Sequence, residues 1–312
     1  MPRTTLLLPA GERLGGQRVG GDLSRALGRA DRGRAGDPGR RAQLRRHVRL
    51  LPDHWPLAAL ARQMDVGDAA GSAWLRADPS YVRPDINGAR LLAIGASLGL
   101  DDEDRAAFLP ALRPLFGDAG FPIDAPHPAR WYLRLPQGAK VPAFAEPADA
   151  LGADLFDHLA EGSEGRRWRV LLGEAQVVLH NHPHNARRAE QGRAPVNSLW
   201  FWGAGALPDS VQSKHAAIHS GDEIALALAD AAGIARPLPS VFAAGSDDAL
   251  FDLHEARDLA ALERDWLLPA CAALARGELR ELSLDFADGR TWTLAPGQRW
   301  RFWRRPLARL DA

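Results

Sequence analysis

The sequence predicts an α/β layered fold, and three features carry that prediction. Strand-like apolar or alternating segments recur along the chain, with segments of helical spacing between them. Hydrophobic residues make up 46% of the 312 residues and charged residues 25%, which is the mixture of a folded globular protein. Strands and helices interleave and do not fall into separate blocks, so a layered α/β fold is favoured over an all-helical one.

Composition excludes several functional classes. Lysine plus arginine equals aspartate plus glutamate at 39 each, so the formal net charge is zero. A nucleic-acid or membrane partner is therefore not expected, since such binders normally carry a basic excess. No apolar run approaches the roughly 20 residues that span a bilayer, and the leucines at 6–8 are too few for a signal peptide, so we expect a cytoplasmic protein. The single cysteine, Cys271, excludes an internal disulfide.

The first half of the chain is expected to alternate strands and helices. It opens with a short buried strand at 6–8, and the Arg- and Gly-rich stretch at 13–49 predicts an interrupted helix with a solvated face. Asp101 can cap a later helix, which Pro110 and Pro114 are expected to distort. The elements after residue 50 are, in order, a helix at 56–64, a strand at 72–84, a strand or short helix at 90–98, the capped helix at 101–120 and a strand at 129–135.

The second half of the chain begins with a segment of different composition. Residues 136–165 hold several Pro and Gly residues, so we expect a long loop or subdomain boundary there, within a single domain spanning 1–312. Gly277 is expected to stop the longest helix, and Asp288-Gly289 to turn a hairpin. The remaining elements are predicted to be helices at 166–179, 222–232 and 254–276 and strands at 197–202, 241–244, 279–286 and 290–294.

Three histidines are the candidates for a metal site. His180, His182 and His184 would share one face if their segment were a strand, and three imidazoles leave a position open on zinc or iron. Against this, Pro183 lies among them and no nearby acid completes the site. The alternative is a helix C-terminus at which the imidazoles contact the last carbonyls.

A second candidate is a site for an anion. Asn185, Arg188 and Asn197 offer amide and guanidinium donors beside a Gly-containing loop, which suits a phosphate or carboxylate. The same side chains could instead form an internal network that locks a helix to a strand. The tryptophans at 197–202 are expected to lie in the core, and Gly203 and Gly205 to permit a tight turn.

Several motifs carry a resemblance to known families. Residues from His182 to Gly205 fit the pattern HPxNxxR…G…PxNxLWxWGxG. Further motifs are WLRADPSYVRPD (74–85), APHPARWYLRL (125–135), LERDWLLPACAALARGEL (262–279) and WRFWRRP (300–306). Together they extend over nearly the whole chain, which resembles the proteobacterial regulatory proteins of the RpfE type. The segment from His182 to Gly205 is also similar to archaeal-type cofactor-independent phosphoglycerate mutases, which belong to the alkaline-phosphatase superfamily.

The resemblance to the mutases implies an α/β layered sheet with helices on both faces, two metal ions and a Ser or Thr nucleophile near them. That mechanism needs an aspartate at the end of the first strand, whereas this strand ends in Leu8-Pro9. The later Asp252 and His254 do not match the enzyme's arrangement. We therefore expect a degenerate scaffold that holds no cofactor, with Mn, Zn or Mg as the alternative.

Three functions remain open. The first is a regulatory protein that binds a phosphorylated or carboxylate small molecule and has lost metal-dependent phosphoryl transfer. The second is an active cofactor-independent phosphoglycerate mutase or related phosphatase, with metal held by the three histidines and the later acids. The third is a protein-interaction module without a small ligand, anchored on a protein partner by the Trp-rich end at 300–305. For the first, the proposed ligand-binding residues are Asn185, Arg188 and Asn197, with Arg76 and Arg134 as weaker additions.

Overall fold

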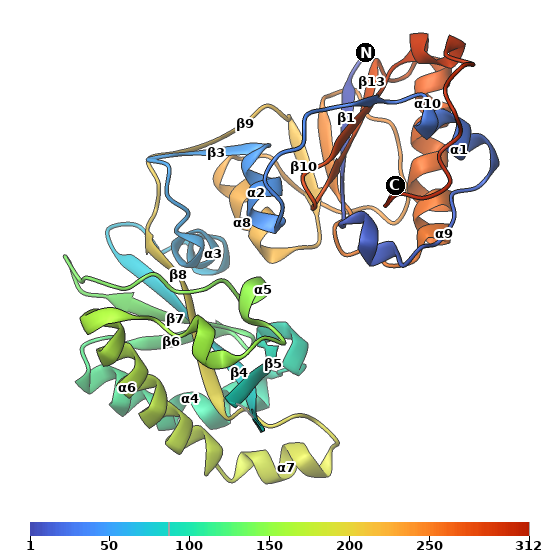
Figure 1. The fold of residues 1–312 in the computed structure, drawn as a ribbon. Coiled ribbons are helices and arrows are strands. Elements are labelled where there is room, and N and C mark those ends of the chain that lie inside the picture. Colours follow the sequence, from blue (N-terminus) through green and yellow to red (C-terminus); the bar gives the residue numbers. More distant parts are fainter. Residues whose placement is uncertain (87, 312) are drawn as a thin grey trace. The chain divides into compact units, whose positions relative to one another are not determined.

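The computed structural model describes residues 1–86 and 88–311, and it confirms the mixed α/β class. The chain divides into two compact units, each with its own sheet (Figure 1). The first unit comprises Met1–Asp53 and Asp209–Ala312, and the second comprises His54–Pro208. Residues 136–165, where the sequence predicts a long loop or subdomain boundary, lie inside the second unit. The chain passes between the units after Asp53 and after Pro208, and the sequence predicts no boundary at either point. Over residues 1–86 and 88–311, every helix is too short or too polar to span a bilayer.

The first unit is built on a seven-stranded sheet in the order β11-β10-β12-β1-β13-β14-β2. The strands from β11 to β13 run parallel, whereas β14 and β2 are antiparallel additions at one side. All five parallel strands therefore end at one edge of the sheet, which we call the carboxyl edge. The strands are β1 (Arg3–Leu8), β2 (Asp31–Arg32), β10 (Ala217–Ser220), β11 (Ala235–Pro237), β12 (Ala249–Asp252), β13 (Glu281–Phe286) and β14 (Thr291–Leu294).

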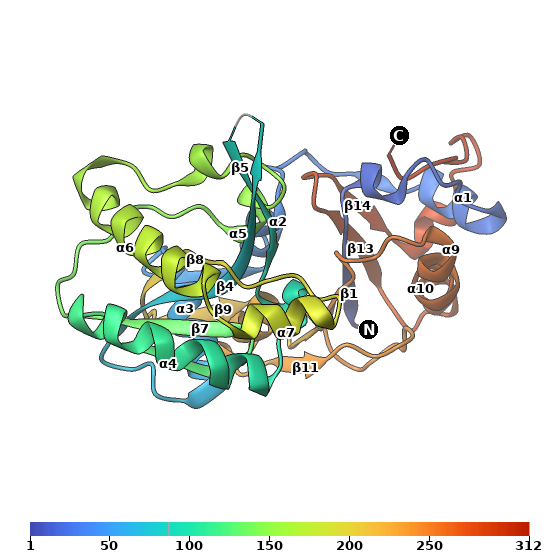
Figure 2. The ribbon, with the colours of Figure 1, turned by 90° about the horizontal axis from the view of Figure 1, so that it is seen from below.

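Helices lie on both sides of this sheet, which explains the uninterrupted Leu6-Leu7-Leu8 run of β1. All three leucines are fully buried, as expected for a strand covered on both faces. Figures 1 and 2 show α1 and α10 to one side of the sheet and α2 to the other. The helical elements of the unit are α1 (Gly21–Gly28), α2 (Arg40–Arg45), α8 (Glu223–Ala231), α9 (Leu259–Leu262), the π-helical η4 (Glu263–Leu267), α10 (Leu268–Arg276), and the 3-10 turns η1 (Gly11–Leu14) and η5 (Pro296–Trp300).

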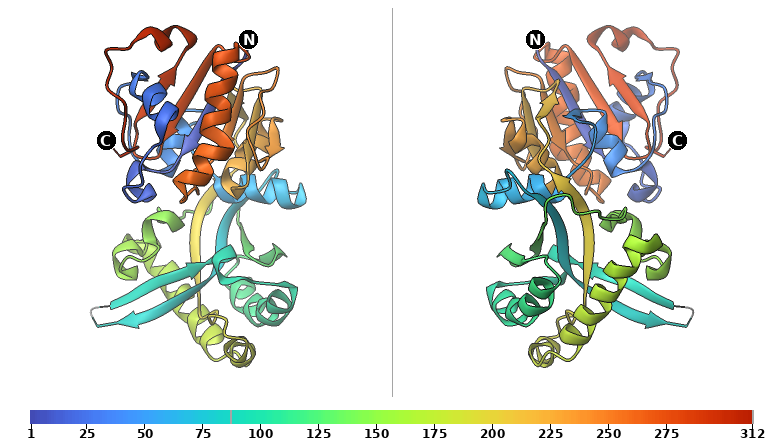
Figure 3. Two further views of the ribbon diagram at one scale, coloured as in Figure 1. Left: turned by 90° about the vertical axis from the view of Figure 1, so that its right-hand side faces the viewer. Right: turned by 90° about the vertical axis from the view of Figure 1, so that its left-hand side faces the viewer.

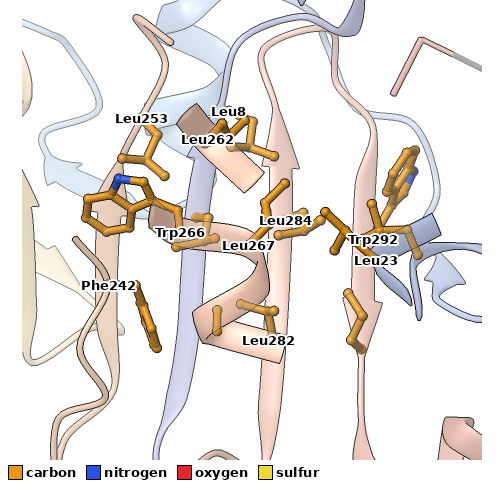
Figure 4. Packing of buried hydrophobic residues seen from close by; sticks show 14 of the residues in the cluster. Leu8, Leu23, Phe242, Leu253, Leu262, Trp266, Leu267, Leu282, Leu284 and Trp292 are labelled. Atoms are coloured by element: carbon orange, nitrogen blue, oxygen red, sulfur yellow. The ribbon is translucent and has the colours of Figure 1, made fainter. Parts of the chain in front are cut away.

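The main core of the first unit lies between the sheet and the α9–α10 segment (Figure 4). Trp266 of η4 packs beside Phe242 at one end of the cluster, with ring centroids 6.5 Å apart. Trp292 of β14 packs with Leu23 of α1 at the other end. Phe242 therefore contributes to the core, but the strand expected at 241–244 is wrong, because that segment has no strand pairing.

The long helix expected from His254 begins later than predicted. Residues before Leu259 form a loop, and Asp258 caps α9 by accepting hydrogen bonds from the amides of Ala260 and Ala261. Its C-terminal stop is confirmed, because Gly277 adopts the left-handed conformation with φ of 77°. A short antiparallel ribbon of β3 (Val48–Leu51) and β9 (Ser210–Ser213) also belongs to this unit.

The second unit contains a five-stranded antiparallel sheet with β4 at its centre. β4 pairs with β5, β7 and β8, and β6 pairs with β7. The β4–β5 hairpin projects beyond the rest of the sheet (Figure 3). The strands are β4 (Ala73–Asp85), β5 (Gly88–Ile94), β6 (Ile123–His127), β7 (Arg130–Leu135) and β8 (Ser198–Ala206).

Helices cover both faces of this second sheet. Leu75, Leu133 and Phe201 point toward α4 and α6, while Trp74 and Tyr132 lie on the face toward Arg62 of α3. α4 runs unbroken through Pro110 and Pro114 and begins at the predicted Asp101 cap. The helical elements are α3 (Leu57–Val66), η2 (Gly95–Leu98), α4 (Asp102–Asp118), α5 (Pro147–Ala150), η3 (Leu155–His158), α6 (Gly162–His180) and α7 (His184–Glu190).

The expected turn at Gly203 and Gly205 is instead part of β8, where the two glycines allow a close approach of α3. Both have positive φ, 71° and 147°. A Cβ at Gly205 would lie 2.7 Å from the Cβ of Pro56, and one at Gly203 would lie 3.0 Å from the amide nitrogen of Ala58. Glycine is therefore required here by both conformation and space.

Candidate functional site

One face of α2 lies against the carboxyl edge of the first sheet. Arg40, Gln43 and the C-cap residue Arg46 are spaced three apart, which places them along one side of the helix. Gln43 is fully buried, and its amide donates to the carbonyl oxygens of Leu8 (3.0 Å) and Asp285 (2.7 Å). The end of β1 is therefore tied to α2 through backbone oxygens.

Arg40 reaches the end of β12, where it meets a buried carboxylate. Asp252 accepts hydrogen bonds from Arg40, from the Ser220 hydroxyl (2.7 Å) and from Nδ1 of His254 (3.0 Å). Arg40 also donates to Asp222, the N-cap of α8, at 3.1 Å. Burial opposes ionisation of Asp252, but the bonds from His254 and Arg40 prevail and hold its pKa below the ordinary value. Asp252 is thus a fully partnered anion.

Arg46 reaches the end of β13 and pairs with a second buried carboxylate. Its Nε and Nη2 donate to the two oxygens of Asp285 at 2.9 and 2.6 Å, the bidentate geometry that guanidinium favours. Nε2 of His47 bonds the same carboxylate at 2.8 Å. Burial would raise the pKa of Asp285, yet His47 and Arg46 lower it overall.

A chain of two imidazoles extends from Asp285. Nδ1 of His47 lies 3.0 Å from Nε2 of His215, and both rings are buried. Burial lowers the pKa of His215 to about 3, and it also lowers the pKa of His47 despite the neighbouring Asp285. The two rings are therefore neutral near pH 7, and they join β9 to the sheet through hydrogen bonds.

These donors do not fit the metal pair that the resemblance to mutases implies. Asp252 and Asp285 are the buried acids of the carboxyl edge, and an arginine already neutralises each of them. β1 supplies no carboxylate, because it ends in Leu8 followed by Pro9. Within residues 1–86 and 88–311, no three His, Cys, Asp or Glu side chains group so that they could hold a metal ion. Two neighbouring cations would need carboxylates that are free to bind them.

A cavity of about 320 Å³ adjoins Asp252 and His254 in the first unit. The other charged residues that line this cavity are mostly acidic. The cavity therefore disfavours binding of the anionic ligand that the sequence predicts. The charged residues around it besides those two are Asp222, Glu255, Asp258, Asp265 and Arg257.

The three histidines do not lie on a strand, and His180 lies at a helix C-terminus, as in the alternative interpretation of this segment. α6 ends at His180 and α7 begins at His184, so the segment is a helix-turn-helix connection. His180 is exposed, His182 packs against Phe108 with centroids 4.9 Å apart, and His184 is buried. The structure does not bring their imidazoles together as a set of ligands.

Arg188 and His184 instead converge on Asp104 of α4. Nη1 of Arg188 donates to Asp104 at 2.6 Å, and Nε2 of His184 lies 2.8 Å from its other oxygen. Arg188 also donates to the carbonyl oxygens of Ala194 (2.8 Å) and Leu98 (2.9 Å). Burial raises the pKa of Asp104, but the bonds from Arg188 and His184 lower it overall. Arg188 is fully buried, so its guanidinium serves the protein's own network.

The two predicted asparagines are likewise bonded to backbone. Asn185 bonds the carbonyl oxygens of Leu179 and Val196 and accepts from the amide of Val196, all within 2.9 Å. Asn197 accepts from the amide of Val82 (2.8 Å) and donates to its carbonyl oxygen (2.7 Å). Each amide extends the backbone pairing of its neighbours.

The two further arginines differ in environment. Arg76 of β4 is 2% exposed, bonds Asp78 at 2.8 Å and stacks over Trp202 at 4.9 Å from the ring centroid. Arg134 of β7 is exposed. The structure therefore does not gather Arg76 and Arg134 with Asn185, Arg188 and Asn197 around one ligand.

A groove in the second unit does contain two of the predicted residues. It has a volume of about 660 Å³, and both Asn197 and His180 line it. Arg169, Gln176 and Asn181 add polar groups, and no carboxylate contributes to its described lining. Apolar walls come from Val82, Leu155, Phe156, Leu159, Leu172 and Val177.

Sequence reasoning missed the carboxyl-edge residues Arg40, Gln43 and Arg46, which lie in the stretch assigned to a solvated helix. Their three-residue spacing was the signal that could have separated them from the surrounding arginines. Asp285 also carried a signal, because a charged residue ending the apolar run of β13 marks the carboxyl edge of a parallel sheet. No sequence signal identified His47 or His215.

Comparison with known proteins gives partial matches, and no protein-family model matches the chain. A probable 2,3-bisphosphoglycerate-independent phosphoglycerate mutase of Geobacter sulfurreducens is 42% identical over 62 residues, which is 20% of this chain and 16% of that protein. The corresponding enzyme of Methanosarcina acetivorans is 32% identical over 122 residues, 38% of this chain and 30% of that protein. The matched part therefore spans less than a third of either curated relative.

Among solved structures, the cofactor-independent phosphoglycerate mutase from Thermoplasma acidophilum aligns with 95% of this chain and 90% of its own, at 16% identity and a TM-score of 0.42. The partial sequence matches show that the chain is remotely similar to cofactor-independent phosphoglycerate mutases. The resemblance to regulatory proteins of the RpfE type remains a prediction.

Proposed function

We propose that this protein is a regulatory, ligand-binding relative of phosphoglycerate mutases that binds a small anionic molecule in the groove of the second unit. The composition of the groove carries the proposal. Arg169, which also donates to the carbonyl oxygen of Ala160, supplies a positive charge, Gln176 and Asn181 supply amides, and no carboxylate of the described lining opposes an anion. Its volume of about 660 Å³ lies within the range of small-molecule sites.

The walls of the groove define the class of ligand further. Leu155, Phe156 and Val177 present apolar surface, with Phe156 61% and Val177 63% exposed. A molecule with an apolar body and one carboxylate or phosphate would bury these side chains while its charge faced Arg169. Such a division between apolar contact and a few orienting polar groups is typical of ligand sites.

The carboxyl edge of the first unit supports the loss of metal-dependent phosphoryl transfer. That chemistry uses metal ions to neutralise the transferring phosphoryl group and to activate the nucleophile. In this chain, the guanidiniums of Arg40 and Arg46 hold the two buried carboxylates, and Gln43 covers the end of β1. These side chains occupy the edge of the sheet at β12, β1 and β13, beside the mostly acidic cavity that adjoins Asp252.

Calorimetric titration with 3-phosphoglycerate, and separately with octanoate, tests the binding proposal. We expect Arg169→Gln to weaken binding of one or both at least tenfold, because a charge-assisted contact is lost. Arg166→Gln is the matched control, since Arg166 is an exposed residue of the same helix that does not line the groove. Absence of binding, or equal weakening in both variants with unchanged melting temperatures, would overturn the proposal.

An active mutase is the second candidate, and the sequence identity to the named mutases favours it. The test is conversion of 3-phosphoglycerate to 2-phosphoglycerate by purified protein with Mn²⁺, Mg²⁺ or Zn²⁺, and again after chelation. We expect no turnover in any metal. Turnover that chelation abolishes and metal restores would establish the enzyme and reject the loss of phosphoryl transfer.

A further inference from the structure

Three large aromatic side chains near the end of the first unit are exposed within four residues of one segment. Residues 299–305 read Arg-Trp-Arg-Phe-Trp-Arg-Arg, which we call the aromatic–arginine segment. Trp300 is 67% exposed, Phe302 81% and Trp303 67%. Other tryptophans of the chain, such as Trp202 and Trp292, are 2% exposed. An apolar cluster of this kind on a folded surface marks an interaction site.

The chain on both sides of the segment is tied to the first unit. Before it, the side-chain amide of Gln298 donates through Nε2 to Asp31 (3.0 Å) and to the carbonyl oxygen of Thr293 (3.1 Å). After it, Leu307 exchanges hydrogen bonds with Ser24 through its amide (2.9 Å) and carbonyl (2.7 Å) groups. Leu310 is 2% exposed and belongs to the core. The aromatic rings therefore project from an anchored chain, which lowers the entropic cost of binding.

The charge of the segment is positive throughout. Four of its seven residues are arginine and none is acidic. Arg301 is held by Asp31, while Arg299 lies over the Trp300 ring at 5.0 Å and Arg304 and Arg305 are exposed. Trp and Arg are the residue types most enriched at binding hot spots.

An apolar cavity adjoins the segment at Arg299. It has a volume of about 140 Å³, and Arg29 and Arg299 are its charged lining residues in the described chain. Leu274, Leu294 and Pro296 form apolar walls. The cavity is large enough for one apolar side chain of a partner.

We propose that the aromatic–arginine segment and this cavity form a docking surface for an acidic, leucine-containing segment of a partner protein. Carboxylates of the partner pair with Arg304 and Arg305, its apolar side chains cover Trp300, Phe302 and Trp303, and one of them enters the cavity. This surface is independent of the groove proposed for the small ligand. A protein is favoured over an anionic bilayer because the chain as a whole has zero formal charge and the cavity adds an apolar site of side-chain size.

The test is fluorescence anisotropy with a labelled peptide rich in Glu and Leu, compared with a Lys and Leu peptide of equal length and with poly-glutamate. We expect the Glu and Leu peptide to bind and the other two to bind at least tenfold more weakly. Trp300→Ala with Trp303→Ala, and Arg304→Glu with Arg305→Glu, should each weaken binding at least tenfold. The controls are Val66→Ala, an exposed apolar residue of α3, and Arg113→Glu, an exposed arginine of α4.

Three outcomes would overturn the proposal. They are absence of peptide binding, equal binding by the double variants with unchanged melting temperatures, and binding to phosphatidylserine vesicles that is stronger than binding to the peptide. The last result would assign the surface to a membrane. Arg169→Gln must leave peptide binding unchanged, so that failure of the groove proposal and failure of this one remain distinguishable.

Discussion

Arg40 of α2 and Asp252 at the end of β12 form an ion pair in which the arginine side chain is 16% exposed and the aspartate is fully buried. Arg46 and Asp285 repeat this arrangement at the end of β13. Because β1 lies between these two strands, the pairs flank the end of β1. In open α/β sheets, ligands bind beyond this edge. Here Gln43 of α2 lies between the two pairs and covers the end of β1.

Arg40→Ala should lower the free energy of unfolding by about 3 to 5 kcal/mol, because it leaves a buried carboxylate without its cation. Arg45→Ala is the control on the same helix. Arg45 is 43% exposed and pairs with Asp53 at 3.5 Å, so its loss should cost at most about 1 kcal/mol. Urea unfolding followed by circular dichroism measures both values. A similar loss of unfolding free energy in the two variants would show that the buried Arg40–Asp252 pair stabilises the protein no more than the exposed Arg45–Asp53 pair.

Mn²⁺ should raise the melting temperature of Arg40→Ala and leave that of the unmodified protein unchanged. Removing the guanidinium frees the oxygens of Asp252 beside His254, both of which can ligate a divalent ion. Stabilisation by a ligand follows from its preference for the folded state. Differential scanning fluorimetry with and without Mn²⁺ measures the effect. An equal rise in both proteins would contradict the view that arginine replaces a cation here.

Much of the secondary structure can be predicted from local sequence patterns, whereas the side-chain contacts at the carboxyl edge of the first sheet cannot. The Leu6–Leu8 strand, the Asp101 cap and the Gly277 stop are all confirmed, because each depends on neighbours in sequence. Arg40 and Asp252 are 212 residues apart, so no local rule joins them. For the donor-rich segment at 185–197, the sequence leaves open both a site for an anion and an internal hydrogen-bond network. Whether its donors face a ligand or the backbone depends on where Asp104 and Val82 lie.

Acid should destabilise the protein from about pH 6.5 downward through His215. Its pKa is about 3 in the folded protein and 6.5 when unperturbed, so between these values the unfolded chain binds a proton that the folded chain does not. Stability therefore falls as pH falls, by about 1.4 kcal/mol per pH unit for this group. The lowered pKa of Asp252 and Asp285 adds a loss only below about pH 4.

His215→Gln should flatten this dependence between pH 6.5 and about 4, since glutamine does not titrate there. The matched control is His180→Gln, at an exposed position of the second unit. Urea unfolding at a series of pH values gives the slopes. If both variants retain the slope of the unmodified protein, the buried imidazole pair is not its source.

Arg188→Ala should destabilise the second unit by about 3 kcal/mol, because Asp104 would keep only Arg193 of its two arginine partners and the carbonyl oxygens of Leu98 and Ala194 would lose their donor. Arg187→Ala is the adjacent control. Its side chain is 65% exposed and pairs with the equally exposed Glu103, so at most about 1 kcal/mol should be lost. A stable Arg188→Ala protein that has lost octanoate or 3-phosphoglycerate binding would restore Arg188 as a ligand-binding residue.

Two tryptophans offer the sharpest contrast between core and surface. Trp202 of β8 is 2% exposed, donates from Nε1 to Asp78 at 2.7 Å and lies beneath Arg76, so Trp202→Ala should cost about 3 to 5 kcal/mol. Trp303 is 67% exposed, so Trp303→Ala should change stability by no more than about 0.5 kcal/mol. Urea unfolding of the two single variants measures this difference. A large cost at Trp303 would mean that the ring packs against the protein in solution, and the docking surface proposed for the aromatic–arginine segment would then lose its central anchor.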